Sequence, residues 1–141
     1  MRAICAIFLL AGVVAAGQLD TVKAEPDLNR RAELAVDQAD HALDAARKAW
    51  QDGDWSATES ALAQLRDAAE LSNASLEQTK QPPRNNRHYK TVEMKMRNLL
   101  RRVDAFRLEV DYDQRDAVNQ VETRLQELHD KILDAVMTKR R

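Results

Sequence analysis

The side chains best suited to chemistry in this chain are three histidines, His41, His88 and His129. An imidazole binds metal ions and haem iron, and it exchanges protons near neutral pH. His129 borders the apolar positions of the last helical pattern, at about the level of Met96 in the pattern before it. Because a b-type haem needs only two such axial ligands, His129 and Met96 define the hypothesis of a haem-carrying helical bundle.

The other two histidines are weaker candidates for a metal site. His41 lies about one helical turn from Asp37 and Asp44, and together these side chains would hold a divalent cation weakly. Acidic residues with this spacing are more typical of a solvated helix face. His88 has positively charged neighbours, which oppose a bound cation. We therefore predict no metal site and no resident cofactor, and the haem hypothesis stands as the alternative.

Signatures of known catalytic sites are missing from the sequence. It contains no Glu-x-x-His pair of a di-iron bundle, no glycine-rich phosphate loop, no His-Glu-x-x-His motif and no serine in a nucleophile elbow. Its single cysteine is Cys5, so the chain beyond it has no disulfide, thiolate metal site or covalent haem attachment. We predict that the protein is not an enzyme; a site assembled only by the fold is the remaining alternative.

The nearly balanced charge of the chain, 22 basic against 23 acidic side chains, hides a strong separation along the sequence. Residues 25–79 carry twelve acidic and five basic side chains, whereas residues 80–102 carry eight basic and one acidic. The basic segment overlaps RNNRHYKTVEMKMRNLLRRVDAFRLEV, residues 84–110. Such a segment indicates either an anionic partner or a helix face that is neutralised by acids on neighbouring helices.

A helical wheel places many of these positive charges on the face opposite the apolar residues of the segment. The residues of that face are Arg87, Lys90, Met94, Arg97 and Arg101. Lys95 and Arg102 flank the apolar residues instead and can lay their aliphatic stems along them. We predict that the basic face binds a protein partner or an anionic surface of phospholipid or lipopolysaccharide head groups, with a solvated helix face as the alternative. No aromatic residues alternate with these charges, so we do not expect a nucleic acid partner.

The composition predicts an all-α fold. The chain has only three glycines and three prolines, and it is rich in strong helix formers. Helix-breaking and capping residues divide it into four predicted helices, at about 27–52, 54–79, 87–110 and 113–139. The three boundaries are marked by Gly53 with Asp54, by Pro82 and Pro83 with Asn85 or Asn86, and by Asp113.

Apolar residues recur every three and four positions in each predicted helix. The third helix has the most regular series, and its members are Tyr89, Val92, Met96, Leu99, Val103, Phe106 and Val110. A series of this length indicates coiled-coil-like packing against another long helix. Short connections favour antiparallel neighbours, so we predict two helical hairpins that form an up-down-up-down four-helix bundle. The alternative is two hairpins side by side, as in a solenoid.

The predicted first turn, WQDGDWSATESAL, resembles a tetratricopeptide-type unit, with Gly53, Asp54 and Trp55 between two helices. The resemblance covers only this hairpin. Thr58 and Leu65 occupy positions where that family has small residues. An array of such units needs about three copies, and no second copy is visible. The resemblance therefore gives no family assignment.

Residues 1–24 have the form of a secretory signal peptide. A positively charged start is followed by an apolar run that ends at Ala16, too short for a membrane span of about 20 residues. Three cleavage positions follow a small residue: after Ala16, after Gly17 and after Ala24. The helix-start pattern EPDLN, which comes directly after Ala24, favours cleavage there. The predicted mature domain is then 25–141, in the periplasm or secreted.

These inferences combine into one functional hypothesis. We expect an exported, non-catalytic helical interaction module that binds through the basic face of its third helix. After cleavage it would not span a membrane, and its regular seams leave open a homodimer through exchanged hairpins.

Overall fold

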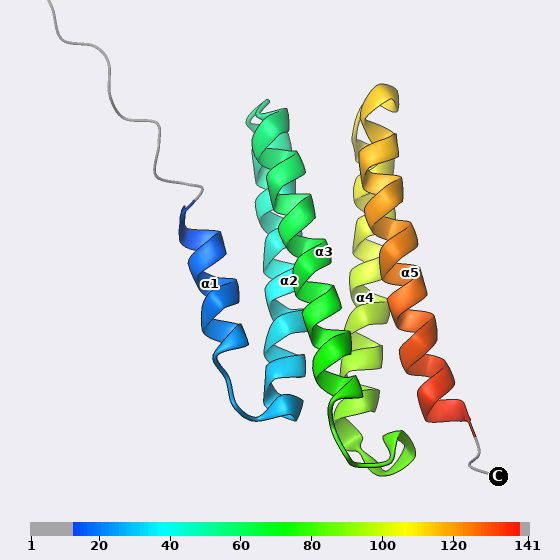
Figure 1. Ribbon diagram of the computed structural model, residues 1–141. Coiled ribbons are helices and arrows are strands. Elements are labelled where there is room, and N and C mark those ends of the chain that lie inside the picture. Colours follow the sequence, from blue (N-terminus) through cyan, green and yellow to red (C-terminus); the bar gives the residue numbers. More distant parts are fainter. Residues whose placement is uncertain (1–12, 139–141) are drawn as a thin grey trace, which may run out of the picture.

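The computed structural model describes residues 13–138 of the chain. Five α-helices make up most of this part (Figure 1). They are α1 (Val13–Lys23), α2 (Leu28–Gln51), α3 (Trp55–Glu77), α4 (Arg87–Glu109) and α5 (Arg115–Met137). Short 3-10 turns, Pro83–Asn85 and Tyr112–Gln114, precede α4 and α5. No strand occurs among the described residues, so the predicted all-α fold is confirmed.

Three of the four predicted helices begin close to the residues that the sequence indicates, because polar side chains cap them. Asp27 accepts hydrogen bonds from two backbone N–H groups, at 3.0 and 3.2 Å, and starts α2. Asp54 accepts one at 3.0 Å and starts α3. Asn86 accepts one at 3.0 Å and starts α4. Each side chain satisfies a donor that the first helical turn leaves without a partner.

The start of the last helix differs from the prediction. The sequence predicts Asp113 as its cap, but Asp113 lies inside the 3-10 turn and is exposed. The backbone N–H of Asp111 donates to the side chain of Gln114 at 3.4 Å, which closes this turn. α5 therefore begins at Arg115, after the turn is complete.

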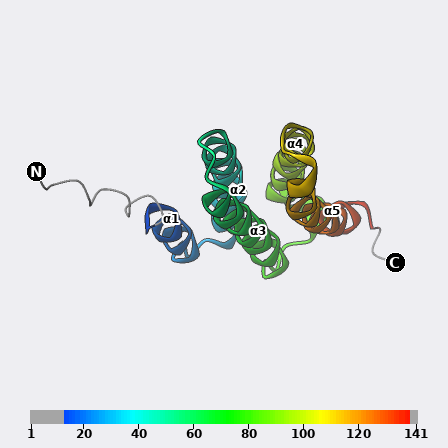
Figure 2. The ribbon, with the colours of Figure 1, turned by 90° about the horizontal axis from the view of Figure 1, so that it is seen from above.

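Consecutive helices from α2 to α5 are antiparallel and form two hairpins, α2–α3 and α4–α5. Gly53 allows the first reversal, because its φ of 76° lies in the left-handed region that other residues rarely adopt. Figure 2 shows the hairpins side by side, with α2 next to α4 and α3 next to α5. α3 and α4 follow one another in the chain but make little contact. The packing corresponds to the side-by-side alternative and not to a ring in which each helix packs against the next.

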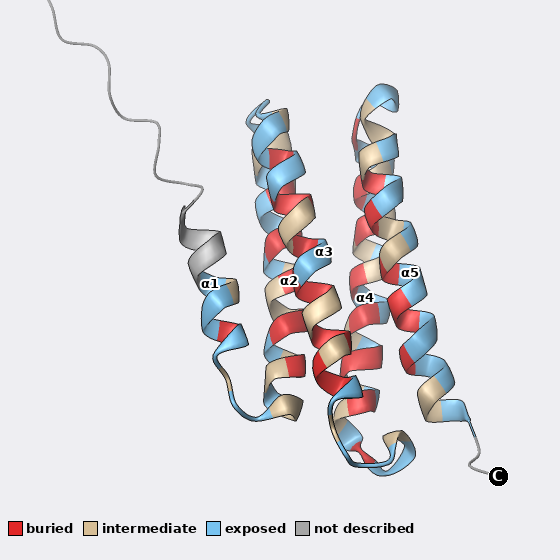
Figure 3. Ribbon diagram, in the orientation of Figure 1, coloured by how far each residue is buried: buried red, intermediate tan, exposed pale blue. Residues whose placement is uncertain are grey.

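The core runs through both hairpins (Figure 3). Its largest fully buried side chains include Leu43, Leu65, Met96, Leu99, Phe106 and Leu125. Alanines dominate the α2–α3 interface, and Ala39 and Ala68 have no exposed surface. Small side chains let the two helix axes come close. The buried Ser72 hydroxyl donates a 2.7 Å hydrogen bond across this interface to the carbonyl of Ala32.

Trp50 links the two hairpins near their turns. Its ring meets Phe106 of α4 edge-on, with the ring centroids 6.1 Å apart. Its indole N–H donates to the side chain of Gln114 at 3.2 Å. The tryptophan therefore satisfies its polar group while its apolar ring packs between helices.

α1 packs against α2 and α3, on the side of the first hairpin that faces away from the second (Figure 2). Val22 is 9% exposed, and the amide of Gln38 donates to that of Gln18 at 3.1 Å. α1 falls within the predicted signal peptide, residues 1–24, of which residues 1–12 lie outside the described part. Across that described part, no helix has both the length and the apolar character needed to cross a membrane.

Candidate interaction surface

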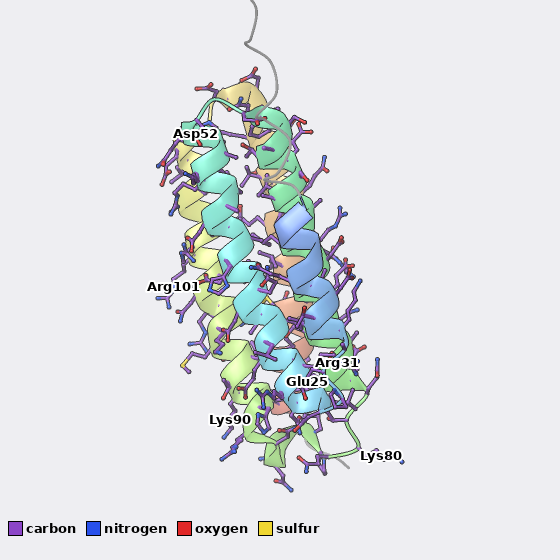
Figure 4. The ribbon with its side chains drawn as sticks, turned by 90° about the vertical axis from the view of Figure 1, so that its left-hand side faces the viewer. Glu25, Arg31, Asp52, Lys80, Lys90 and Arg101 are labelled. Atoms are coloured by element: carbon purple, nitrogen blue, oxygen red, sulfur yellow. The ribbon has the colours of Figure 1, made fainter. Side chains whose placement is uncertain are left out.

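The five residues of the predicted basic face all lie on the exposed side of α4. Arg87, Lys90, Arg97 and Arg101 are exposed, and Met94 is 54% exposed among them. Figure 4 shows Lys90 and Arg101 projecting away from the bundle. The apolar series on the opposite side of α4 is buried. The period of the α-helix therefore predicts correctly which side of α4 is exposed.

Arg97 differs from the other four residues because a neighbouring carboxylate holds it. Its Nη2 atom lies 2.6 Å from both carboxylate oxygens of Glu93, and its Nε atom donates to the same group at 3.0 Å. Glu93 precedes Arg97 by four residues, the spacing that places two side chains on one helix face. The charge of Arg97 is thus compensated within α4.

Glu93 also connects α4 to α5. His129 Nε2 lies 2.8 Å from Glu93 Oε1, and each residue is only 8% exposed. An ionised carboxylate only accepts hydrogen bonds, so His129 donates from Nε2. Burial raises the pKa of Glu93, but hydrogen bonds from Arg97 and His129 outweigh this effect and hold the pKa below its usual value. Glu93 and His129 are buried between the helices of the second hairpin, and Arg97 binds the same carboxylate from the exposed side.

The two residues of the haem hypothesis have other contacts in this structure. His129 donates from Nε2 to Glu93, and its Nδ1 atom is buried without a hydrogen-bond partner among the described residues. Met96 has no exposed surface and packs within the core. Ligation of iron by this pair would require the core around Met96 to open.

A row of ion pairs joins α4 to the acidic face of α2. The pairs are Lys95–Asp37, Arg102–Asp40, Arg102–Asp44 and Arg47–Glu109, and a hydrogen bond joins His88 to Glu33. The Nζ atom of Lys95 lies 2.8 Å from its carboxylate. Lys95 and Arg102, which the sequence places beside the apolar seam, therefore pair with the first hairpin. Much of the charge separation in the sequence is neutralised at this interface.

The same pairs account for the acids near His41. Asp37 and Asp44 bind Lys95 and Arg102, and His41 is exposed. No group of three or more potential metal ligands occurs among residues 18–138, whose side chains the structure describes.

Four cations near the α3–α4 connection have no such partner. Lys80, Arg84, Arg87 and Lys90 are exposed, and none forms an ion pair with another described residue. The sequence from 78 to 92 contains no acidic residue. We call these four residues the basic end. Of these four residues, the predicted basic face includes Arg87 and Lys90. Lys80 and Arg84 precede the helix, so a helical wheel does not assign them to a face.

The opposite end of the molecule is acidic. The turns of the two hairpins and the first turn of α5 carry five exposed aspartates, Asp52, Asp54, Asp111, Asp113 and Asp116. In Figure 4, Asp52 lies at the end remote from Lys80 and Lys90. Charge is therefore separated along the length of the molecule, although its formal net charge is only −1.

Comparison of the chain with models of protein families, with curated proteins and with solved structures found no match. The resemblance of the first hairpin to a tetratricopeptide-type unit gains no support from these comparisons. A functional assignment therefore has to come from the surface of the molecule itself.

Proposed function

We propose that the protein is an exported, non-catalytic helical module that binds an anionic partner through the basic end and the adjoining basic face of α4. The observation that carries this proposal is the set of four exposed cations without a carboxylate partner. Elsewhere on α4 the cations Lys95, Arg97, Arg102 and Arg107 pair with carboxylates, and Arg101 donates to the side chain of Asn98.

Unpaired positive charge at one end attracts an anion before contact is made. Surface charges act over a Debye length of about 8 Å at physiological salt, and clustered charges of one sign speed association. Arg84 and Arg87 also lie next to Asn86, the cap of α4, where the helix dipole adds positive potential. The field at this end is therefore stronger than the net charge of the molecule suggests.

The basic end is anchored to the core, which keeps its charges in place. Asn86 is 2% exposed, caps α4 and donates at 2.9 Å to Asn29 of α2. The hydroxyl of Tyr89 donates at 2.9 Å to the carbonyl of Leu76 at the end of α3. A surface that is already ordered loses less conformational entropy when it binds.

The partner presents carboxylate or phosphate groups. An acidic protein segment and an envelope membrane with anionic head groups both meet this requirement. Met94, exposed between Lys90 and Arg97, adds an apolar contact to the charged face.

The test compares capture of partners by the protein and by two charge-reversed variants. Arg87→Glu/Lys90→Glu changes the basic end, and Lys48→Glu/Lys131→Glu makes the same change of charge at exposed sites elsewhere. Arg97 is left intact, because a carboxylate at its position would face Glu93. All three proteins are incubated with native envelope extract and with vesicles that contain anionic lipid.

We expect the first variant to bind about 30-fold more weakly, since each cation near an anionic surface contributes about 1 kcal/mol. The second variant should bind like the unaltered protein. Equal binding by all three, or binding by none, would show that the basic end is an ordinary solvated surface. Loss confined to vesicles or to a protein fraction identifies the class of partner.

A further inference from the structure

We infer that the signal peptide is cleaved after Ala16 or Gly17, and not after Ala24. The cut would then lie just before Gln18, whose side chain contacts α2. The inference rests on export, which is part of the proposed function. It changes the expected mature chain from 25–141 to one that retains Gln18–Lys23 as a folded element.

The first argument is the packing of α1 from Gln18 onward. Leu19 contacts the hydrophobic core, and Val22 is 9% exposed. Gln18 accepts a hydrogen bond from Gln38 of α2. Ala35 of α2, which belongs to the face that α1 approaches, has no exposed surface. These contacts are those of a structural helix of the domain.

The second argument is the connection between α1 and α2. The carbonyl of Lys23 accepts a hydrogen bond from Arg31 at 3.3 Å. The backbone N–H groups of Ala24 and Glu25 donate back into the last turn of α1, each at 3.1 Å. Arg31 is partly buried, and its Nη1 bond to the Lys23 carbonyl would be lost together with that residue.

Cleavage after Ala24 would remove all of these contacts. The small apolar side chains of α2 that α1 covers would meet water, and the burial of Leu19 and Val22 would be lost. Burial of apolar side chains stabilises a fold, so exposure of these two residues and of the α2 surface beneath them would destabilise the domain. Cleavage after Ala16 or Gly17 removes the apolar run and keeps Gln18–Lys23, the part of α1 that makes these contacts.

The sequence around the two earlier positions is compatible with this assignment. Ala15 and Ala16 end the apolar run and Gly17 follows it, so small residues stand where signal cleavage sites have them. The position after Ala24 is separated from that run by Asp20 and Lys23. The helix-start pattern that favours Ala24 marks the start of α2, and the structure shows that another helix precedes it.

The full chain is expressed in a bacterial host, the envelope fraction is collected, and the intact mass and N-terminal sequence of the protein are determined. A mature chain that begins at Gly17 or Gln18 supports the inference. A chain that begins at Glu25 overturns it and leaves export intact. An unprocessed chain overturns the inference together with export, whereas anion binding by the basic end is tested separately.

A second measurement compares the thermal unfolding of chains 18–141 and 25–141. We expect Tm to be about 5 °C lower or more for the shorter chain, because about 1 kcal/mol corresponds to several degrees in a domain of this size. In the longer chain, Leu19→Ser/Val22→Ser should reproduce this loss, whereas Asp20→Ser at an exposed position should not. Equal Tm values for the two chain lengths would show that α1 contributes nothing to the stability of the fold. That result would contradict the inference that cleavage spares Gln18–Lys23.

Discussion

Glu93 neutralises one of the exposed cations of α4. It is the single acidic residue between positions 80 and 102, and it lies inside the basic segment. Its carboxylate binds Arg97 on the same helix and His129 on α5. Arg97 is therefore part of the structure of the second hairpin, whereas no carboxylate of the described residues pairs with Arg87, Lys90 or Arg101.

The lowered pKa of Glu93 predicts a loss of stability in acid. The charged form is favoured in the folded state, so its contribution is fully present above the unfolded pKa of about 4.5 and is lost as the pH falls through the lower folded value. We expect Glu93→Gln to reduce this part of the pH dependence, measured by urea unfolding at pH 6 and pH 3. Glu59→Gln, at an exposed position, is the control. An identical pH dependence in Glu93→Gln and the unaltered protein would contradict this contribution of Glu93.

The exposure of individual residues on α4 is predictable from the sequence, but their partners are not. Arg87, Lys90, Met94 and Arg101 are exposed because the period of an α-helix places them opposite the apolar series. His129 comes from another helix, and its distance from Glu93 depends on the rotation and register of α4 against α5. A helical wheel contains neither quantity.

At the scale of the element, the alanine face of α2 sets how closely α3 can approach. Ala39 has no exposed surface at this interface, so Ala39→Leu inserts a large side chain where no space exists. We expect a loss of about 1–3 kcal/mol in the free energy of unfolding, measured in urea. Ala45→Leu places the same side chain at an exposed position of the same helix and should have little effect. Equal effects of the two substitutions would show that the helices are loosely packed.

Helix boundaries follow closely from capping residues, and the two exceptions have physical causes. The start of α5 is delayed because Asp111 and Gln114 close a 3-10 turn, a local alternative that competes with capping by Asp113. α1 is not predicted as a folded element, because the apolar run before it dominates the pattern of residues 1–24. Only its contacts with α2 and α3 identify it as part of the domain.

At the scale of the whole molecule, the sequence leaves two arrangements of the hairpins open. The same apolar seams serve a ring of helices and two hairpins side by side, since in both cases each helix buries one broad face. The row of ion pairs between α2 and α4 belongs to the side-by-side arrangement, in which these parallel helices are neighbours. The composition of the two segments indicates that an acidic helix could pair with a basic one. It does not predict the register in which the two helices align.

The separation of charge predicts how the protein adsorbs to charged surfaces. Despite a net charge of −1, we expect it to be retained at pH 7 and low salt by a cation exchanger through the basic end. Arg87→Glu/Lys90→Glu should elute at clearly lower salt, and Lys48→Glu/Lys131→Glu should change elution less. The elution profiles measure this directly. Elution of both variants at the same salt concentration would mean that the field at the basic end is not distinctive.

The short turn at Gly53 also has a kinetic consequence. It joins two helices whose residues meet near their point of connection, so the first hairpin closes a small loop and loses little chain entropy in doing so. Helical proteins dominated by such local contacts fold in microseconds to milliseconds. The docking of one hairpin against the other brings together segments much further apart along the chain, and that step is therefore expected to limit the rate of folding.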